Sequence, residues 1–393
     1  MEHLRQKQAA GGEADLDVPP AVTARRLAAQ LLAEPLTADS PQGRPAARRV
    51  EAVVEVVGRL LAIQAQDLRG LRLAIRSRTV GLTVADVDRA FAQGRLVVTW
   101  LNRGTLHLVR AEDYRWLHTL TAPRHETAIR RRLDDEGVSP AEAERGVTLI
   151  DKALADDGPL TRARLRDRLA AAGVPTAGQA LIYLLALASL RGQLIRGPMA
   201  GAEQAYARPV DWLGAAGRPG EGRPPLGRDD ALAQLAVRYL GSHGPADERD
   251  LATWAGLPLR DARDGLALAA SRGQIERVDA RLADLPGRPL GLGGRAWDEV
   301  DLASLPPRLL GPFDPVLHGW ARREWVTGAH RAVVTVNGIF RPTALVAGRS
   351  AATWTMPGGE VTLSPFAPLS PQISDALQTE AADVRRFLAG SPS

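Results

Sequence analysis

Two glutamines separated by one residue, Gln64 and Gln66, are the strongest candidates for chemistry in this sequence. In an extended segment, residues i and i+2 face the same side, so both amides can line one cavity while Ile63 and Ala65 face the interior. An amide offers an acceptor oxygen and donor hydrogens, which suits holding a water molecule with no pKa to tune. The alternative is a pair of solvent-exposed glutamines at a helix end.

An acidic residue and a basic run follow the glutamines directly. Asp67 competes with them as a general base, but in an extended segment it points away from them, and we expect it to cap the next helix. Arg69, Arg72 and Arg76 then stand at i, i+3 and i+7, on one helical face, and are predicted to bind phosphate groups. The alternative is an ordinary solvated helix face.

Other candidates lie further along the chain. Arg103 is predicted to reach a nucleic-acid backbone, and Gly104 beside it allows a close approach. His107 falls in a strand-like pattern, so we expect a hydrogen-bonded core histidine rather than a catalyst. Arg341 follows a hairpin-turn signal and is predicted to enter a groove of the nucleic acid, whereas its neighbour Phe340 is expected in the core.

Helical and strand-like patterns surround these residues. Apolar spacing predicts helices near residues 23–32, 50–61 and 83–93, the last capped by Thr83, and strands at 95–100 and 104–109. Two stretches, starting at Gly158 and Gly244, each read as helix, turn, helix and a short hairpin, which is the order of a winged-helix module. Two unrelated helical hairpins are the alternative.

The last quarter of the chain has a different pattern. It predicts strands at 332–336 and 343–346, with a hairpin turn at Asn337-Gly338, and a closing helix at 373–388. We therefore predict an α+β, mainly helical fold of tandem winged-helix modules. The predicted parts are a disordered tail (1–20), unit 1 with the glutamines (21–144), unit 2 (145–225), unit 3 (226–300) and a β-rich C-terminal segment (301–393).

Composition narrows the classes of function. The formal net charge of +5 and a sequence pI of about 10.1 favour a polyanionic partner. There is no cysteine, and the seven histidines show no metal-ligand spacing, so we expect neither a metal nor another cofactor. No apolar run approaches the roughly 18 residues that span a bilayer, and a signal peptide is absent, so we expect a cytoplasmic protein without membrane association.

Four motifs occur in a specific order: Gln64-Ala65-Gln66, residues 102–109, Phe313-Asp314-Pro315 and residues 337–343. Together with the repeated helical units, they resemble the winged-helix DNA glycosylases of the AlkZ and YcaQ type. The resemblance covers about residues 20 to 390 and implies a basic tandem winged-helix body acting on double-stranded DNA. It implies that Gln64 and Gln66 are the catalytic pair, in the branch with glutamine rather than aspartate at the second position.

The family's substrates make sense of catalytic amides. Its members excise bulky or crosslinking N-alkylpurines, and some protect producers of DNA-alkylating antibiotics. A purine alkylated at N7 or N3 is already a cation and leaves without general-acid protonation, so the enzyme mainly positions a water at C1′. We expect a nucleoid-associated monomer with this activity. The alternatives are a non-catalytic winged-helix DNA-binding or regulatory protein and a silent member that sequesters a toxic small molecule.

Overall fold

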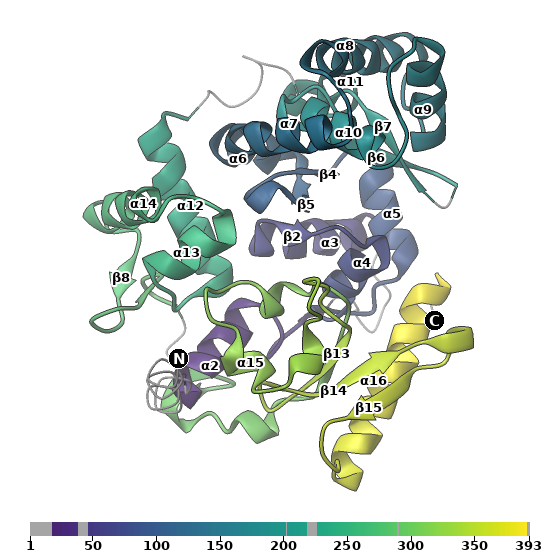
Figure 1. Cartoon of the computed structure of the whole chain (residues 1–393). Coiled ribbons are helices and arrows are strands. Elements are labelled where there is room, and N and C mark those ends of the chain that lie inside the picture. The colour runs from purple at the N-terminus through teal and green to yellow at the C-terminus, as the bar shows by residue number, and fades with distance from the viewer. Residues whose placement is uncertain (1–17, 38–45, 202, 218–225, 289–290, 391–393) are drawn as a thin grey trace, which may run out of the picture.

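The segment with the two glutamines folds as helix, short strand, two helices and a hairpin. The computed structural model describes residues 18–37, 46–201, 203–217, 226–288 and 291–390, so the predicted tail lies mostly outside the described residues. The elements of unit 1 are α3 (Ala46–Leu60), β2 (Ile63–Gln64), α4 (Leu68–Arg76), α5 (Val84–Ala92), β4 (Leu96–Trp100) and β5 (Leu106–Arg110). In Figure 1 they occupy the middle of the molecule.

Local sequence signals explain where these elements start. The carboxylate of Asp67 accepts a hydrogen bond from the backbone N–H of Gly70, which confirms the predicted cap of α4. Thr83 and Asp86 form a reciprocal capping box at the start of α5. The predicted strand pair is also confirmed, since β4 and β5 run antiparallel, and β2 pairs with β5 on its other side.

Units 2 and 3 repeat this order of elements. Unit 2 comprises α8 (Pro140–Asp157), α9 (Arg162–Ala171), α10 (Ala180–Leu190), β6 (Ile195–Ala200) and β7 (Glu203–Ala207), and unit 3 comprises α12 (Arg228–His243), α13 (Glu248–Ala255), α14 (Leu259–Ser271), β8 (Glu276–Arg277) and β9 (Ala283–Asp284). In each unit one residue before the second helix bridges back to the last strand: Leu160 to Tyr206, and Ala246 to Ala283. The predicted helix, turn, helix and hairpin order is therefore confirmed, while the unit boundaries stay predictions.

Unit 1 differs from units 2 and 3 in the loop before its second helix. In units 2 and 3 the bridging residue is followed at once by the cap of the second helix, Thr161 or Asp247. In unit 1 the last paired residue of β2 is Gln64, and the cap comes only at Asp67. The two additional residues, Ala65 and Gln66, extend the loop at this end of the strand.

Units 1 and 2 share one sheet. Val98 of β4 pairs with Arg196 of β6, which gives a five-stranded sheet in the order β2-β5-β4-β6-β7. Two helices, α6 (Ala111–Thr121) and α7 (Glu126–Asp135), connect the units. The predicted boundary between units 1 and 2, near residue 144, therefore separates helices that pack on the same sheet.

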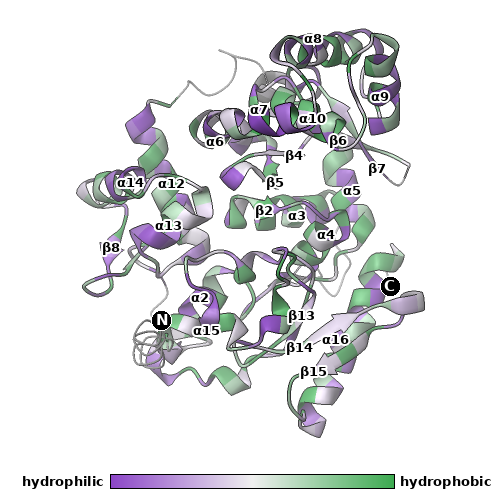
Figure 2. Cartoon of the chain, in the orientation of Figure 1, coloured by the Kyte–Doolittle hydropathy of each residue, from purple (hydrophilic) through white to green (hydrophobic). Residues whose placement is uncertain are grey.

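The third helices of the units differ in exposure. Helix α10 is buried along most of its length, and α5 packs against α3, β6 and the C-terminal helix. Helix α14 buries only one side, through Ala262, Gly265, Leu266 and Ala269. Figure 2 shows hydrophobic and hydrophilic residues alternating along α14, as expected for a helix with one open face.

The C-terminal segment is a four-stranded antiparallel sheet closed by a helix. Its elements are β12 (Arg308–Leu310), β13 (Thr343–Val346), β14 (Arg349–Thr355), β15 (Thr362–Pro365) and α16 (Pro371–Ala389). The prediction of a strand at 332–336 is wrong, because Arg331–Val333 is a 3-10 turn and only Val334 bridges to Phe340. The turn at Asn337-Gly338 is present, with Gly338 at φ 73°.

A buried ion pair ties this segment to unit 1. The guanidinium of Arg78 donates two hydrogen bonds to the carboxylate of Asp314, at 2.9 and 2.8 Å, and neither side chain is exposed. The remaining short elements are α2 (Pro20–Ala29), β1 (Leu36–Thr37), β3 (Thr79–Val80), α11 (Pro209–Trp212), β10 (Gly291–Leu292), β11 (Arg295–Ala296) and α15 (Glu324–Thr327). Among the helices of the described residues, none is both long and apolar enough to cross a membrane.

Candidate active site

Strand β2 places the two predicted amides in contact. Gln64 lies opposite His107 of β5 and is buried, with 6% of its surface exposed, while Gln66 is exposed in the loop beyond the strand. The amide nitrogen Nε2 of Gln64 donates a hydrogen bond to Oε1 of Gln66. In an extended segment, every second side chain faces the same side. The structure confirms that Gln64 and Gln66 meet in this way.

Arg103 reaches the glutamine pair from the tip of the β4–β5 hairpin. It lies in a 3-10 turn, Asn102–Gly104, with a left-handed φ of 57°. Its Nη2 donates to Oε1 of Gln64 at 3.2 Å, and its Nη1 donates to the backbone carbonyl of Trp254 in α13. The hairpin of unit 1 thus connects the glutamines to unit 3.

A glycine allows this contact between the units. Gly256, which ends α13 in the left-handed region at φ 67°, lies against the backbone of Arg103. A Cβ atom at this position would stand 2.7 Å from the backbone nitrogen of Arg103. A side chain on residue 256 would therefore push the hairpin tip away from α13.

The site is positively charged, and its histidines are neutral. In the described part of the chain no carboxylate forms an ion pair with Arg103, and Arg323 lies close enough to repel it. Burial and this repulsion lower the pKa of Arg103 to about 10, so it stays charged at neutral pH. Burial also lowers the pKa of His107 and of His318, and the charge of Arg103 adds to both shifts.

Hydrogen bonds fix the two neutral imidazoles. His107 Nδ1 lies 3.0 Å from the carbonyl of Thr105, and His318 Nε2 lies 2.9 Å from that of Phe313. A carbonyl only accepts, so these nitrogens carry the protons. His107 is 1% exposed, which agrees with the expected hydrogen-bonded core histidine. Within the described residues, no group of His, Asp and Glu is arranged to hold a metal ion.

The three arginines of α4 do not share one exposed face. Arg69 is exposed, and its guanidinium lies beside Met356. Arg72 is half-buried and pairs with Asp88 of α5. Arg76 has a side chain only 3% exposed and pairs with Glu380 and Asp383 of α16. The structure contradicts the predicted phosphate contact for Arg76, because α16 packs on this face of α4 and its carboxylates hold the guanidinium.

Arg341 lies in a groove with other cations. The groove has a volume of about 640 Å³, and Arg323, Arg331 and Arg341 line it together with one carboxylate, Glu324. The turn beside it exposes two apolar side chains, Val336 and Ile339. Phe340 is buried, as expected, and Arg323 lies over its ring at 5.2 Å. Because Arg323 also repels Arg103, this groove adjoins the glutamine site.

Sequence reasoning did not find His318 or Arg323 as site residues. Both lie more than 250 residues from the glutamines along the chain, and only the fold brings them close to Arg103. Arg103 was singled out, but its contact with Gln64 depends on the pairing of β2 with β5. No spacing rule predicts a contact between residues that far apart.

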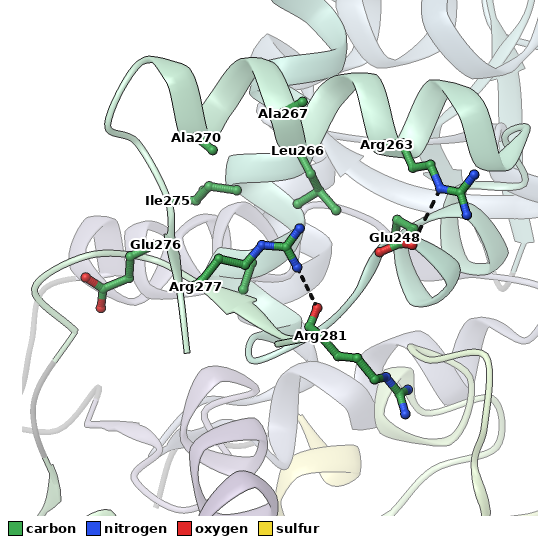
Figure 3. A pocket seen from close by; sticks show the side chains of 10 residues that line it. Glu248, Arg263, Leu266, Ala267, Ala270, Ile275, Glu276, Arg277 and Arg281 are labelled. Atoms are coloured by element: carbon green, nitrogen blue, oxygen red, sulfur yellow. Dashed lines mark hydrogen bonds and ion pairs between the residues drawn. The ribbon is translucent and has the colours of Figure 1, made fainter. Parts of the chain in front are cut away.

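A second groove lies in unit 3, between α14 and the β8–β9 hairpin. Figure 3 shows Arg263 directed at Glu248, and Arg277 directed at the backbone carbonyl of Arg281. The groove has a volume of about 310 Å³, and its lining mixes these cations with the carboxylates of Glu248 and Glu276. Its lining has one carboxylate more than that of the groove around Arg341.

The comparisons define the class of protein. A family model described as DNA glycosylase AlkZ-like matches residues 57–387 of this chain. A chain of repeated helix-turn-helix units with a paired-amide site thus belongs to the AlkZ-like DNA glycosylase family, whose members hydrolyse N-glycosyl bonds in DNA. This membership supports a glycosylase over a non-catalytic winged-helix regulator.

A curated relative and a solved structure, both from Streptomyces sahachiroi, are similar to this chain. The chain is 27% identical over 344 residues, 84% of its own length and 90% of the relative's, to an interstrand DNA cross-link repair glycosylase of Streptomyces sahachiroi. The solved structure of Streptomyces sahachiroi DNA glycosylase AlkZ is similar, with a TM-score of 0.71, 25% sequence identity, and coverage of 94% of this chain and 96% of that one. These likenesses agree with the mainly helical α+β fold.

Proposed function

We propose that this glycosylase excises bulky purines alkylated at N7 or N3 from double-stranded DNA and unhooks interstrand crosslinks. Its relative of 27% identity is named for cross-link repair, which supports the crosslink as a substrate. The observation that carries the proposal is the hydrogen-bonded amide pair of Gln64 and Gln66 beside a charged arginine. We place the activity in DNA repair, or in self-resistance to a genotoxic natural product, in a monomeric cytoplasmic protein at the nucleoid.

The amide pair is suited to a cationic leaving group. An alkylated purine carries its positive charge before the bond breaks, so no acid has to protonate it. The two amide oxygens act as acceptors that align a water for attack at C1′. The electrons of the glycosidic bond leave with the purine, which becomes neutral, and the proton that the water loses passes to solvent. Asp67 is the nearest acid in sequence, but its carboxylate is bonded to the start of α4. Because amides are weak bases, the site is expected to leave neutral, unmodified bases in place.

Exposed and half-buried arginines are proposed as the phosphate contacts. Arg69, Arg72 and Arg341 remain our candidates for binding the DNA backbone, and Arg323 joins Arg341 in the same groove. Arg76 is withdrawn from this set because α16 buries it. The fully exposed side chain of Val336 on the neighbouring turn also faces solvent, where DNA has access to it.

The first test is excision from a duplex carrying N7-alkylguanine or a nitrogen-mustard crosslink, with abasic sites revealed by mild alkali. We expect the Gln64→Ala/Gln66→Ala protein to lose at least about 100-fold in single-turnover rate, as when a group that stabilises the transition state is removed. Its affinity for the duplex should stay close to that of the parent protein, because amides do not bind phosphates as cations do.

The matched control is Gln93→Ala, an exposed glutamine at the end of α5. It should excise at the parental rate. Wild-type excision by the double glutamine variant would overturn the assignment of the amides. Excision of methylated bases alone, with crosslinks left intact, would restrict the substrate to monoadducts.

A further inference from the structure

We propose that Arg103 is a positioning residue that fixes which way the amides of Gln64 and Gln66 face, so that both oxygens are available to the water. The inference rests on the proposed role of the two glutamines. It assigns Arg103 a task inside the protein, in place of the DNA-backbone contact that its sequence position predicts.

The argument begins with the symmetry of an amide. The oxygen and nitrogen of a glutamine side chain are nearly equal in size, so a half-turn exchanges an acceptor for a donor at little steric cost. A guanidinium only donates. Arg103 Nη2 lies 3.2 Å from the Gln64 side chain, so the atom facing it must be Oε1. Arg103 therefore selects one of the two orientations of Gln64.

The orientation of the Gln64 amide also fixes that of Gln66. With Oε1 of Gln64 turned to Arg103, its Nε2 donates toward Gln66, which must present an oxygen in return. Each amide oxygen then uses one lone pair inside the site and keeps the other. Two acceptors remain for the two hydrogens of one water, which leaves the water's own lone pair free to attack C1′. A half-turn of the Gln64 amide would replace both acceptor oxygens by N–H donors. The water would then present its lone pairs to the amides instead of to C1′.

Arg103 is itself held firmly for this task. Its backbone lies in a 3-10 turn packed on Gly256, and its Nη1 is bonded to the carbonyl of Trp254. Trp254 is 2% exposed and packs on the rings of Tyr239 and His243. In the described residues no carboxylate pairs with Arg103 and draws it away from Gln64. Unit 3 thus sets the polarity of the amides in unit 1.

The experiment compares Arg103→Met and Arg103→Lys in full-length protein on duplex DNA with an N7-alkylguanine. Single-turnover rate at saturating enzyme, the dissociation constant for DNA and its salt dependence are measured separately. Arg103→Met should slow excision about 100-fold, with affinity and salt slope unchanged, because misplaced groups cost about this much in rate. Arg103→Lys keeps a donor-only head group and should recover part of the rate.

A double mutant separates positioning from an independent role. Arg103→Met added to Gln64→Ala should slow excision no further than Gln64→Ala alone, because Arg103 acts through Gln64. If the rate losses of the two single variants multiply in the double variant, the proposal is overturned. So would weaker DNA binding with a salt slope reduced by about one and an unchanged saturated rate, which would identify a phosphate contact.

Controls keep the outcomes distinct. Arg95→Met removes a half-exposed arginine of unit 1 bonded to Glu51, and should leave every measurement unchanged. A thermal unfolding scan checks that Arg103→Met is folded, and Arg103→Lys tests the proposal again if it is not. Full activity of the Gln64→Ala/Gln66→Ala protein would overturn the proposed function, whereas a multiplicative double mutant beside inactive glutamine variants would overturn only the positioning role.

Discussion

At the residue scale, the catalytic pair differs from a carboxylate pair in having nothing to titrate. The groups around it are fixed as well: His107 and His318 are buried and neutral, and the pKa of His318 falls to about 3. Arg103 is the charged group that bonds to Gln64, and its pKa is about 10. The protonation state of the site is therefore constant across the neutral range.

This constancy predicts the pH dependence of the reaction. The single-turnover rate, corrected for spontaneous depurination, should be flat from about pH 6 to about pH 9 and should fall near pH 10 as Arg103 loses its proton. Arg103→Lys should shift the falling limb, whereas Gln93→Ala should not. A bell-shaped profile with a pKa between about 6 and 8 would mean that a histidine or a carboxyl group takes part in the chemistry.

At the scale of elements, the pair Arg78 and Asp314 holds the C-terminal segment against unit 1. Both side chains are fully buried, so Asp314→Ala leaves an unpaired charge in the interior. We expect it to lower the free energy of unfolding by about 3–5 kcal/mol, measured by urea denaturation. Arg385→Ala, which breaks the exposed pair with Glu360, should cost less than about 1 kcal/mol. Equal losses in the two variants would contradict this role.

The elements themselves were largely predictable from local sequence. Asp67 and Thr83 marked helix starts, and the repeated order in units 2 and 3 followed from turn residues and apolar spacing. The failures have physical causes. The run 332–336 has strand-like residues but only one bridging partner, and Arg76 stands at a helical spacing that says nothing of α16 packing over it. The joining of β4 to β6 and the contact of Arg103 with Gln64 depend on tertiary pairing.

At the scale of the whole molecule, buried histidines connect stability to pH. Burial lowers the pKa of four of them, His107, His118, His243 and His318, below the value near 6.5 that they have when unfolded. Below that pH the unfolded chain binds protons that the folded protein does not. Their contribution to stability is therefore complete above about pH 6.5 and is lost progressively as the pH falls toward each folded pKa.

We expect the free energy of unfolding to drop between pH 7 and pH 5, by up to about 1.4 kcal/mol per pH unit for each histidine. Carboxyls with a raised pKa, such as those of Asp250 and Asp284, act in the opposite direction. The variant His118→Asn isolates one histidine away from the glutamines and should show a shallower slope in urea denaturation. An unchanged slope would contradict the assignment.

The additional residues Ala65 and Gln66 of unit 1 bear on how such an enzyme arises. Three units with the same order of elements provide an internal comparison, and in two of them the cap of the second helix follows the bridging residue directly. If Gln66 orients the water, two additional residues in one loop distinguish the unit that performs hydrolysis from the units that only build the scaffold. The chemistry then requires no fold of its own, because the same order of elements builds the scaffold of the other two units.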